Sequence, residues 1–210
     1  MPLQFPLAAI HPTHAESLLA TGYRRSGKFL YRTSCSQCTA CEPIRVIASQ
    51  FTPNRSQKRA LKKGNSELSV SIGRPICDEE HVALFNRHRN DRGLNRHGVN
   101  VDLEEYRMFL VDSCLDSFEI SYFYQDQFVG AAIFDQAADS ISAVYTYFDP
   151  DYSRLSLGVY SVIKQVEYCL DRGLRFLYLG YFVDGSPHML YKQNYRPHQR
   201  LQEGKWVDYP

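Results

Sequence analysis

The most constraining feature of this sequence is a strand–turn–helix–strand pattern between residues 141 and 192. Residues 141–148 form an apolar strand, Gly158 lies at the start of an apolar helix, and residues 176–183 form a second apolar strand. We expect the two strands to lie side by side and to splay near their C-terminal ends, where ligands enter open α/β sheets. A glycine at a helix start leaves backbone N–H groups facing an anionic ligand, and the helix dipole adds to the attraction.

The length and composition are those of a globular chain. With 210 residues, the chain can form one large domain or two small ones around a real core. The 44% hydrophobic and 22% charged residues are typical of soluble proteins, and no apolar run is long enough for a membrane span. The N-terminal lead lacks a basic region followed by an apolar core. We therefore expect a cytoplasmic protein with no membrane partner.

The net charge of +1 hides an uneven distribution. Residues 1–65 contain ten Lys or Arg against two Asp or Glu, a net charge of +8, whereas residues 66–210 contain 14 against 21, a net charge of −7. Asn54 is expected to cap a helix that is rich in basic residues. These residues are Arg55, Lys58, Arg59, Lys62 and Lys63. The helix is either a solvated surface or a phosphate-binding element, and the basic front half indicates an anionic partner.

Three of the six cysteines, Cys35, Cys38 and Cys41, are spaced by two residues each. Because no secretion signal is present, a disulfide framework is not expected. Repeated Cys-x-x-Cys spacing is typical of zinc or iron–sulfur ligation, so these cysteines are the predicted metal ligands. A reduced, metal-free loop is the alternative. The candidates for a fourth ligand, by chemistry alone, are Cys77, His11 and His14.

The remaining segments indicate a mixture of strands and helices. Residues 29–31 and 43–48 are predicted to be two strands of one small sheet. Asp78 and Asp102 are expected to begin helices. The three strands that follow, expected to form a meander, are residues 118–124, 128–135 and 141–148.

This order of elements resembles the acetyltransferase-like (GNAT) architecture, in which the turn after the long fourth strand holds a phosphate-bearing acyl donor. The expected fold is α+β, with a GNAT-type mixed sheet and flanking helices. We assign residues 67–210 to this catalytic domain and residues 1–66 to a preceding basic region that contains the cysteine motif.

Short motifs give a more specific resemblance. They lie at residues 22–27, 30–32, 35–46, 51–57, 84–85, 106–110, 142–150, 155–158, 177–182, 189–192, 196–197 and 204–206. In these motifs and their order, the chain resembles the aminoacyl-tRNA–protein transferases of the N-end rule, which include bacterial leucyltransferases acting on aspartate or glutamate and the arginyltransferases. One departure is the lead, which has no cysteine where the family usually has a Cys-x-Tyr-Leu-Pro element.

The resemblance implies a reaction in which the α-amine of a protein N-terminus attacks the ester carbonyl of an aminoacyl-tRNA. A leucyl or arginyl group would pass to proteins that begin with Asp or Glu, which marks them for degradation. Because the ester is already activated, the enzyme mainly needs to position two substrates and to assist proton movement. No diffusible cofactor is implied.

Five residues near the C-terminal ends of the two core strands are expected to carry the chemistry. They are Asp149, Tyr178, Tyr181, Tyr191 and Lys192. Tyr178 and Tyr181 should lie on opposite strand faces because their spacing is odd, so at most one should face a given cleft. Asp149 precedes a proline and can equally be a turn residue without chemical function.

The substrates suggest a second set of residues. A carboxylate of the acceptor favours Arg forks, so Arg45 and Arg55, with Ser56 and Gln57, are the expected acceptor contacts. Arg55 can equally contact a phosphate. The residues expected to meet the tRNA are Lys58, Arg59, Arg154 and Gly158.

Other classes of protein remain open at this point. A small-molecule N-acetyltransferase of the same fold would use acetyl-CoA, but the basic helix and the cysteine loop would then be unexplained. A metal-dependent RNA-binding protein without catalysis would leave the acyltransferase-like half idle, and an inactive binder of N-terminal residues would keep only the region of Arg45 and Arg55. Leucine and arginine both remain open as the transferred residue, because a single sequence assigns no apolar or acidic pocket.

Overall fold

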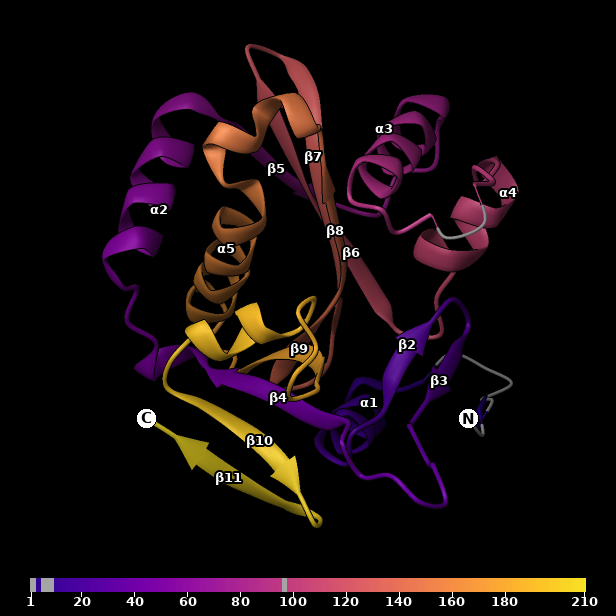
Figure 1. Ribbon diagram of the computed structural model, residues 1–210, viewed down its shortest axis with the longest axis vertical. Coiled ribbons are helices and arrows are strands. Elements are labelled where there is room, and N and C mark those ends of the chain that lie inside the picture. Colours follow the sequence, from indigo (N-terminus) through magenta and orange to yellow (C-terminus); the bar gives the residue numbers. More distant parts are fainter. Residues whose placement is uncertain (1–2, 5–9, 96–97) are drawn as a thin grey trace.

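The computed structural model describes residues 3–4, 10–95 and 98–210, which form a large sheet, a small sheet and helices on both faces of the large one (Figure 1). The helices are α1 (Pro12–Ala20), α2 (Arg55–Glu67), α3 (Glu79–Asp91), α4 (Leu103–Tyr106) and α5 (Leu157–Asp171). Short helical turns are η1 (Ala48–Gln50), η2 (Arg107–Val111), η3 (Pro150–Leu155) and η4 (Leu190–Asn194). The strands are β1 (Leu3–Gln4), β2 (Arg24–Ser26), β3 (Phe29–Tyr31), β4 (Glu42–Ile47), β5 (Ser69–Gly73), β6 (Asp116–Tyr124), β7 (Gln127–Gln136), β8 (Ser140–Phe148), β9 (Phe176–Phe182), β10 (His198–Gln202) and β11 (Lys205–Tyr209).

The large sheet has the strand order β11-β10-β4-β9-β8-β7-β6-β5. Strands β8 and β9 run parallel, are joined by α5, and pair only from Ser140 opposite Phe176 to Ser142 opposite Tyr178. Beyond these positions the two strands diverge, because β8 continues beside β7 while β9 continues beside β4. The predicted splay is confirmed, as are the meander of β6, β7 and β8 and the acetyltransferase-like arrangement of a mixed sheet with flanking helices.

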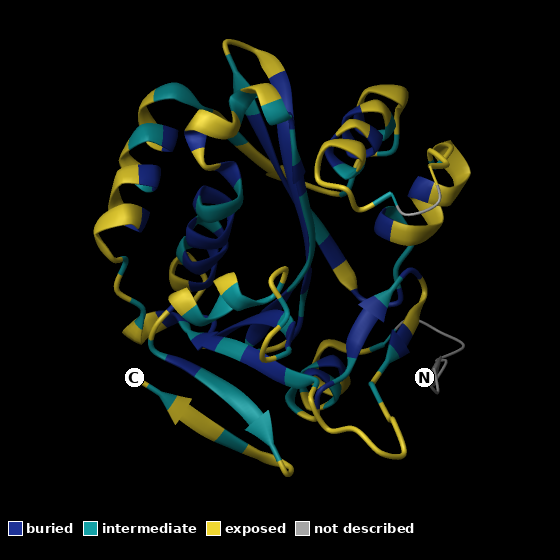
Figure 2. Ribbon diagram, in the orientation of Figure 1, coloured by how far each residue is buried: buried dark blue, intermediate teal, exposed yellow. Residues whose placement is uncertain are grey.

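The sheet separates two helical layers. Helices α2 and α5 pack together on one face, where Leu157 and Val166 of α5 meet Ile44 and Leu177 of the sheet. Helix α3 lies on the other face, where Phe85 packs against β8 (Figure 1). Figure 2 shows buried residues along the central strands and the inner side of α5. This pattern is that of elements burying one apolar face each around a shared core.

Three predicted helix starts carry a side-chain cap. Asn54, Asp78 and Asp102 accept hydrogen bonds from backbone amides in the first turns of α2, α3 and α4, at 3.0, 2.9 and 2.8 Å respectively. These bonds satisfy amide groups that a helix start otherwise leaves unpaired. In the described part of the chain, no helix is long and apolar enough to cross a membrane.

One predicted pairing is wrong. Strand β3 pairs with β1 and β2 in the small sheet, whereas β4 lies inside the large sheet between β10 and β9. The reason is that both faces of β4 are covered. Ile44 and Val46 are fully buried on the α5 side, and Arg45 is enclosed by aromatic rings on the other side. Strand β4 and helix α2 of the front region thus belong to the main sheet and its helical layer, and the domain boundary at residue 66 stays a prediction.

Candidate functional site

The splay between β8 and β9 is bordered by Tyr178 and Tyr181, which lie on the same side of β9. Both rings contact the guanidinium of Arg24, whose Cζ lies 5.0 Å from the centroid of Tyr178 and 5.7 Å from that of Tyr181. The expectation that these tyrosines face opposite sides is therefore wrong. Gly180 between them has φ of +84°, and the β4 register shifts opposite this segment. Only glycine adopts this backbone conformation readily, and it breaks the alternation of the strand.

Arg24 is buried, with 4% of its surface exposed, and its charge has no carboxylate partner among the described residues. Nη1 donates to the carbonyls of Leu19 at 3.2 Å and Tyr23 at 2.5 Å, and Nη2 lies 3.5 Å from the carbonyl of Gly180. Its Nε is buried without a hydrogen-bond partner. Burial lowers the pKa of Arg24 to about 10, so the side chain is still a cation at neutral pH.

Lys192, on η4, reaches the same segment of β9. Its Nζ donates to the carbonyl of Tyr181 at 2.6 Å, and it lies 3.5 Å from the position that a Cβ on Gly180 would occupy. Burial, and to a lesser extent the charge of Arg24, lowers the pKa of Lys192 to about 8. Two cations thus converge on Gly180 and Tyr181 from different parts of the chain.

The two tyrosine hydroxyls are already engaged. Tyr178 accepts from Arg45 Nη1 at 3.1 Å, and Tyr181 donates to the carbonyl of Gly22 at 2.8 Å. Burial raises the pKa values of both phenols, so they remain neutral at physiological pH. The hydrogen bonds with Arg45 and Gly22 fix the two tyrosine rings around Arg24. Another predicted catalytic residue, Tyr191, is 49% exposed on η4 beside Tyr195.

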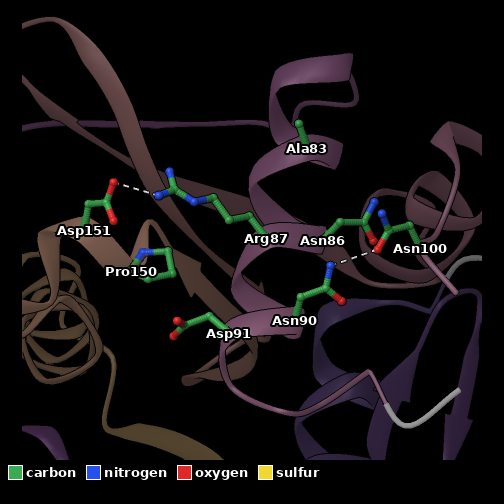
Figure 3. Close-up of a pocket in the computed structure, with 8 residues that line it drawn as sticks. All are labelled: Ala83, Asn86, Arg87, Asn90, Asp91, Asn100, Pro150 and Asp151. Carbon is green, nitrogen blue, oxygen red and sulfur yellow. Dashed lines mark hydrogen bonds and ion pairs between the residues drawn. The ribbon is translucent and has the colours of Figure 1, made fainter. Parts of the chain in front are cut away.

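Asp149 is built into the turn at the end of β8. It is buried, accepts from Arg87 Nη1 at 2.7 Å and accepts from the backbone amide of Asp151 at 2.9 Å. Arg87 also donates to the Asp151 carboxylate at 2.7 Å, as Figure 3 shows. These contacts give Asp149 a capping role in the structure, whereas its predicted catalytic role stays a prediction.

A cavity of about 570 Å³ lies on the α3 side of this turn (Figure 3). Its lining residues are Ala83, Asn86, Arg87, Asn90, Asp91, Asn100, Pro150 and Asp151. None of the predicted site residues lines it. Asn90 donates to Asn100 at 3.1 Å, and Asn86 holds the backbone of Val101 through two bonds, so the amides are used to fix the chain around the cavity.

His88 of α3 is a residue that sequence reasoning missed as a site candidate. Its Nδ1 lies 3.0 Å from the carbonyl oxygen of Phe148 at the end of β8, and burial lowers its pKa. An imidazole that is held neutral beside this strand end is suited to accept a proton. Its helical position could have been read from the sequence, but its contact with β8 comes from tertiary packing.

The donor turn differs in detail from the expectation. Helix α5 begins at Leu157, so Gly158 is its second residue, and the N-cap Ser156 makes no side-chain capping bond. A Cβ on Gly158 would lie at ordinary contact distance, 3.5 Å, from Phe148. Glycine here therefore supplies open space beside the first amides of α5. Arg154, predicted to meet the tRNA, pairs with Glu67 at 2.6 Å, and its contact with the tRNA stays a prediction.

The basic face of α2 is exposed, which both a solvated surface and a phosphate-binding element require. Arg55, Lys58, Arg59 and Lys62 occupy i, i+3, i+4 and i+7 positions, and together with Pro53 and Asn54 they line a groove of about 460 Å³. Within the described residues none of the four basic side chains forms an ion pair. We refer to these four residues as the basic stripe. A row of unpaired cations along a groove is suited to successive phosphates.

Three other predicted contacts serve the fold. Gln57 is buried, completes the capping box with Asn54 and donates to the carbonyl of Asn194 at 3.1 Å, which ties α2 to η4. Ser56 donates to the Asn54 side chain at 2.7 Å. Arg45 donates to Gln199 at 2.7 Å, and its guanidinium carbon lies over two aromatic rings. These rings are Phe176, at 3.7 Å, and Trp206, at 3.9 Å.

The cysteine loop gives no support to the predicted metal site. Cys35 and Cys38 are exposed, and Cys41 is partly exposed. In the part of the chain that the structure describes, no three His, Cys, Asp or Glu side chains are grouped so as to hold a metal ion, and the candidates Cys77, His11 and His14 do not complete such a group. Cys77 instead contacts the carbonyl of Leu103 at 3.5 Å. The residues do not fit a zinc or iron–sulfur centre in this arrangement.

Comparison with known proteins identifies the family to which the sequence is similar. The model for "Arginine-tRNA-protein transferase, C terminus" matches residues 80–202, and the model for the N terminus matches residues 2–59. The aspartate/glutamate leucyltransferase of Teredinibacter turnerae is 40% identical over 204 residues, which cover 97% of this chain and 84% of that protein. That of Thiobacillus denitrificans is 41% identical over 194 residues, covering 90% and 79% respectively.

Solved structures share the fold at low sequence identity. FemX matches with a TM-score of 0.51 and 9% identity, over 82% of this chain and 60% of its own. L-PGS from Bacillus licheniformis matches with a TM-score of 0.51 and 12% identity, over 82% of this chain and 51% of its own. These likenesses concern the fold alone, whereas the family models and the long matches to curated relatives concern the sequence. The chain therefore belongs to the arginine-tRNA-protein transferase family of enzymes.

Proposed function

We propose that this enzyme transfers a leucyl group from leucyl-tRNA to the α-amine of proteins that begin with Asp or Glu, which marks them for degradation. The observation that carries the proposal is the 40% identity over 97% of the chain with a relative named aspartate/glutamate leucyltransferase. The name of that relative favours leucine over arginine, a choice that the sequence patterns left open.

The chemistry is an exchange of an ester for an amide. The amine nitrogen bonds to the ester carbonyl carbon, the bond from that carbon to the ribose oxygen breaks, and the proton lost by the nitrogen ends on that oxygen. The protein mainly contributes position, because holding amine and ester together removes much of the entropic barrier. In this proposal the aminoacyl group binds where β8 and β9 diverge, with the first turn of α5 facing the terminal nucleotide.

The basic stripe supplies the tRNA contact in this proposal. Its four side chains are exposed and have no acidic neighbours in ion-pair range among the described residues. The hydrogen bond from Gln57 to Asn194 links the helix that carries the stripe to η4, and so to Lys192. A tRNA held along α2 would thus have its 3′ end near the splay.

The direct test offers purified protein both leucyl-tRNA and arginyl-tRNA, with model peptides that begin with Asp, Glu, Lys or Arg. We expect leucine to be transferred to the Asp and Glu peptides only. Transfer of arginine, or transfer to Lys or Arg peptides, would contradict the proposal. Binding of tRNA without any transfer would favour the RNA-binding alternative, and acetylation by acetyl-CoA would favour a small-molecule acetyltransferase.

Neutralising part of the basic stripe tests the tRNA contact. The double variant Lys58→Gln, Lys62→Gln should reduce the steepness of the slope of log affinity against log salt by about 1.4 to 1.8. The reason is that binding without these two phosphate contacts releases fewer counterions from the tRNA. The matched control is Lys28→Gln, which removes an exposed lysine paired with Asp112 at 3.2 Å. Binding isotherms at several salt concentrations give the slopes. Equal slopes for the double variant and the wild type would reassign the stripe to a solvated surface.

A further inference from the structure

Arg24 and Lys192 bring two positive charges to one short segment of β9. Arg24 Nη2 lies 3.5 Å from the carbonyl of Gly180, and Lys192 Nζ lies 2.6 Å from the carbonyl of Tyr181. Neither side chain has an ion-pair partner in the described ranges 3–4, 10–95 and 98–210. We call these two residues the cation pair.

The cation pair is costly for the protein alone. A buried charge without a counter-ion loses hydration that backbone carbonyls and ring faces replace only in part. Arg24 is 4% exposed and keeps a buried Nε with no hydrogen-bond partner, so its donors are not all used within the chain. An anionic ligand would supply the missing negative charge.

We propose that the cation pair binds the side-chain carboxylate of the acceptor's N-terminal Asp or Glu. Lys192, which is partly exposed, would contact the carboxylate, and Arg24 behind it would add the second charge. This inference rests on the proposed function. In an Asp residue the α-amine is only three bonds from the carboxylate carbon, so fixing the carboxylate also fixes the nucleophile beside the splay.

The arrangement favours an acceptor carboxylate over a tRNA phosphate. Tyr178 packs with Ala15, Leu19 and Leu30 of the N-terminal region, on the sheet face opposite the layer of α2 and α5. The basic stripe, by contrast, is exposed on α2 and offers a whole row of cations to a polyanion. Two cations on adjacent carbonyls of one strand segment match a single carboxylate better than a chain of phosphates.

The experiment compares peptides that begin with Asp and with Asn, which differ only in the charged group. Single-turnover transfer from saturating leucyl-tRNA gives kcat/KM for each peptide. In Lys192→Met, which keeps the length of the side chain, the Asp/Asn ratio should fall at least about tenfold, and Lys192→Arg should restore most of it. The matched control is Lys58→Met in the basic stripe, which should raise the KM for tRNA and leave the Asp/Asn ratio unchanged.

Each outcome bears on one claim. An unchanged Asp/Asn ratio in Lys192→Met would overturn the inference. A loss of tRNA affinity alone would also overturn it, because the cation pair would then bind a phosphate of the tRNA. An equal loss with both peptides would place Lys192 in the transfer step and would also overturn it. Failure of the wild type to transfer leucine to any peptide would instead defeat the proposed function. Because Lys192 Nζ has one carbonyl partner among the described residues, both variants should fold, and thermal denaturation checks this.

Discussion

Arg24 and Arg25 are neighbours on β2 and both are buried, yet their charges have opposite surroundings. Arg25 Nε donates to both carboxylate oxygens of Asp135, at 2.9 and 2.8 Å, and its terminal nitrogens donate to four backbone carbonyls. Asp135 also accepts from Ser117 at 2.5 Å. Arg24 contacts carbonyls and two tyrosine rings, and within the described residues it meets no carboxylate.

The contrast shows that burial of an arginine does not by itself reveal its role. Successive residues of a strand point to opposite sides, so Arg25 reaches Asp135 of β7 while Arg24 reaches Gly180 of β9. Arg25 is satisfied within the fold and needs no ligand. Arg24 is not satisfied, and the inferred acceptor carboxylate beside Lys192 would supply the missing partner.

The largest expected effect comes from removing each arginine in turn. Arg25→Met leaves Asp135 buried without a counter-ion and should lower the free energy of unfolding by about 3–5 kcal/mol. Arg24→Met removes a charge that has no counter-ion, so the loss should be below about 2 kcal/mol. Urea unfolding of both variants provides the comparison. If Arg24→Met destabilised the fold as much as Arg25→Met, Arg24 would be a structural residue and the contrast would fail.

A smaller effect is expected from pH. With a pKa of about 8, Lys192 is a cation below that pH and becomes neutral above it. The Asp/Asn ratio should therefore be high near pH 7 and fall up to about tenfold by pH 9, whereas an ordinary lysine would hold it constant. The α-amine of the Asp peptide adjoins a carboxylate and has a higher pKa than that of the Asn peptide, so each rate is divided by the unprotonated fraction of its own peptide before the ratio is taken. A ratio that stays level across this range would separate Lys192 from acceptor recognition.

The groups around the cation pair whose pKa values are shifted keep their protons in this range. Arg24 has a pKa of about 10, and burial raises the pKa values of Tyr31, Tyr178 and Tyr181, so none of these loses its proton below pH 9. Glu16 and Arg45 interact electrostatically with Tyr178. Cys41 interacts with Tyr31 and Tyr181. Its thiol needs a separate control.

Local signals were sufficient to predict much of the fold. The apolar runs around α5 indicated the paired and splayed strands, and Asn54, Asp78 and Asp102 each began a helix as expected. The spacing of the basic stripe also follows from the sequence, because helical periodicity places its members on one face. These features depend on residues that are close in the chain.

Features that depend on distant contacts were missed. The predicted position of β4 was wrong because its partners, β9 and β10, lie more than a hundred residues later in the chain. Arg24 lies within the sequence motif at residues 22–27, and only packing against β9 shows that it is buried without a counter-ion. The shared side of Tyr178 and Tyr181 had a usable signal, since a glycine inside a strand often marks a bulge.

The smallest expected effect concerns Cys41, which interacts electrostatically with Tyr31 and with Tyr181, one of the rings beside Arg24. A thiolate at Cys41, or a metal held there, would change the charge beside the cation pair. The structure shows Cys41 partly exposed and outside any metal-binding group of the described residues, so Cys41→Ser should leave the Asp/Asn ratio within about twofold of the wild type. The pH midpoint of that ratio should also stay near 8, since Lys192 sets it. Zinc and iron analysis of both proteins completes the test. A shifted midpoint would show that the Cys41 thiol changes the charge around Lys192, and a metal lost with the thiol would show that the cysteine loop binds one. Either result would weaken the contrast between Arg24 and Arg25.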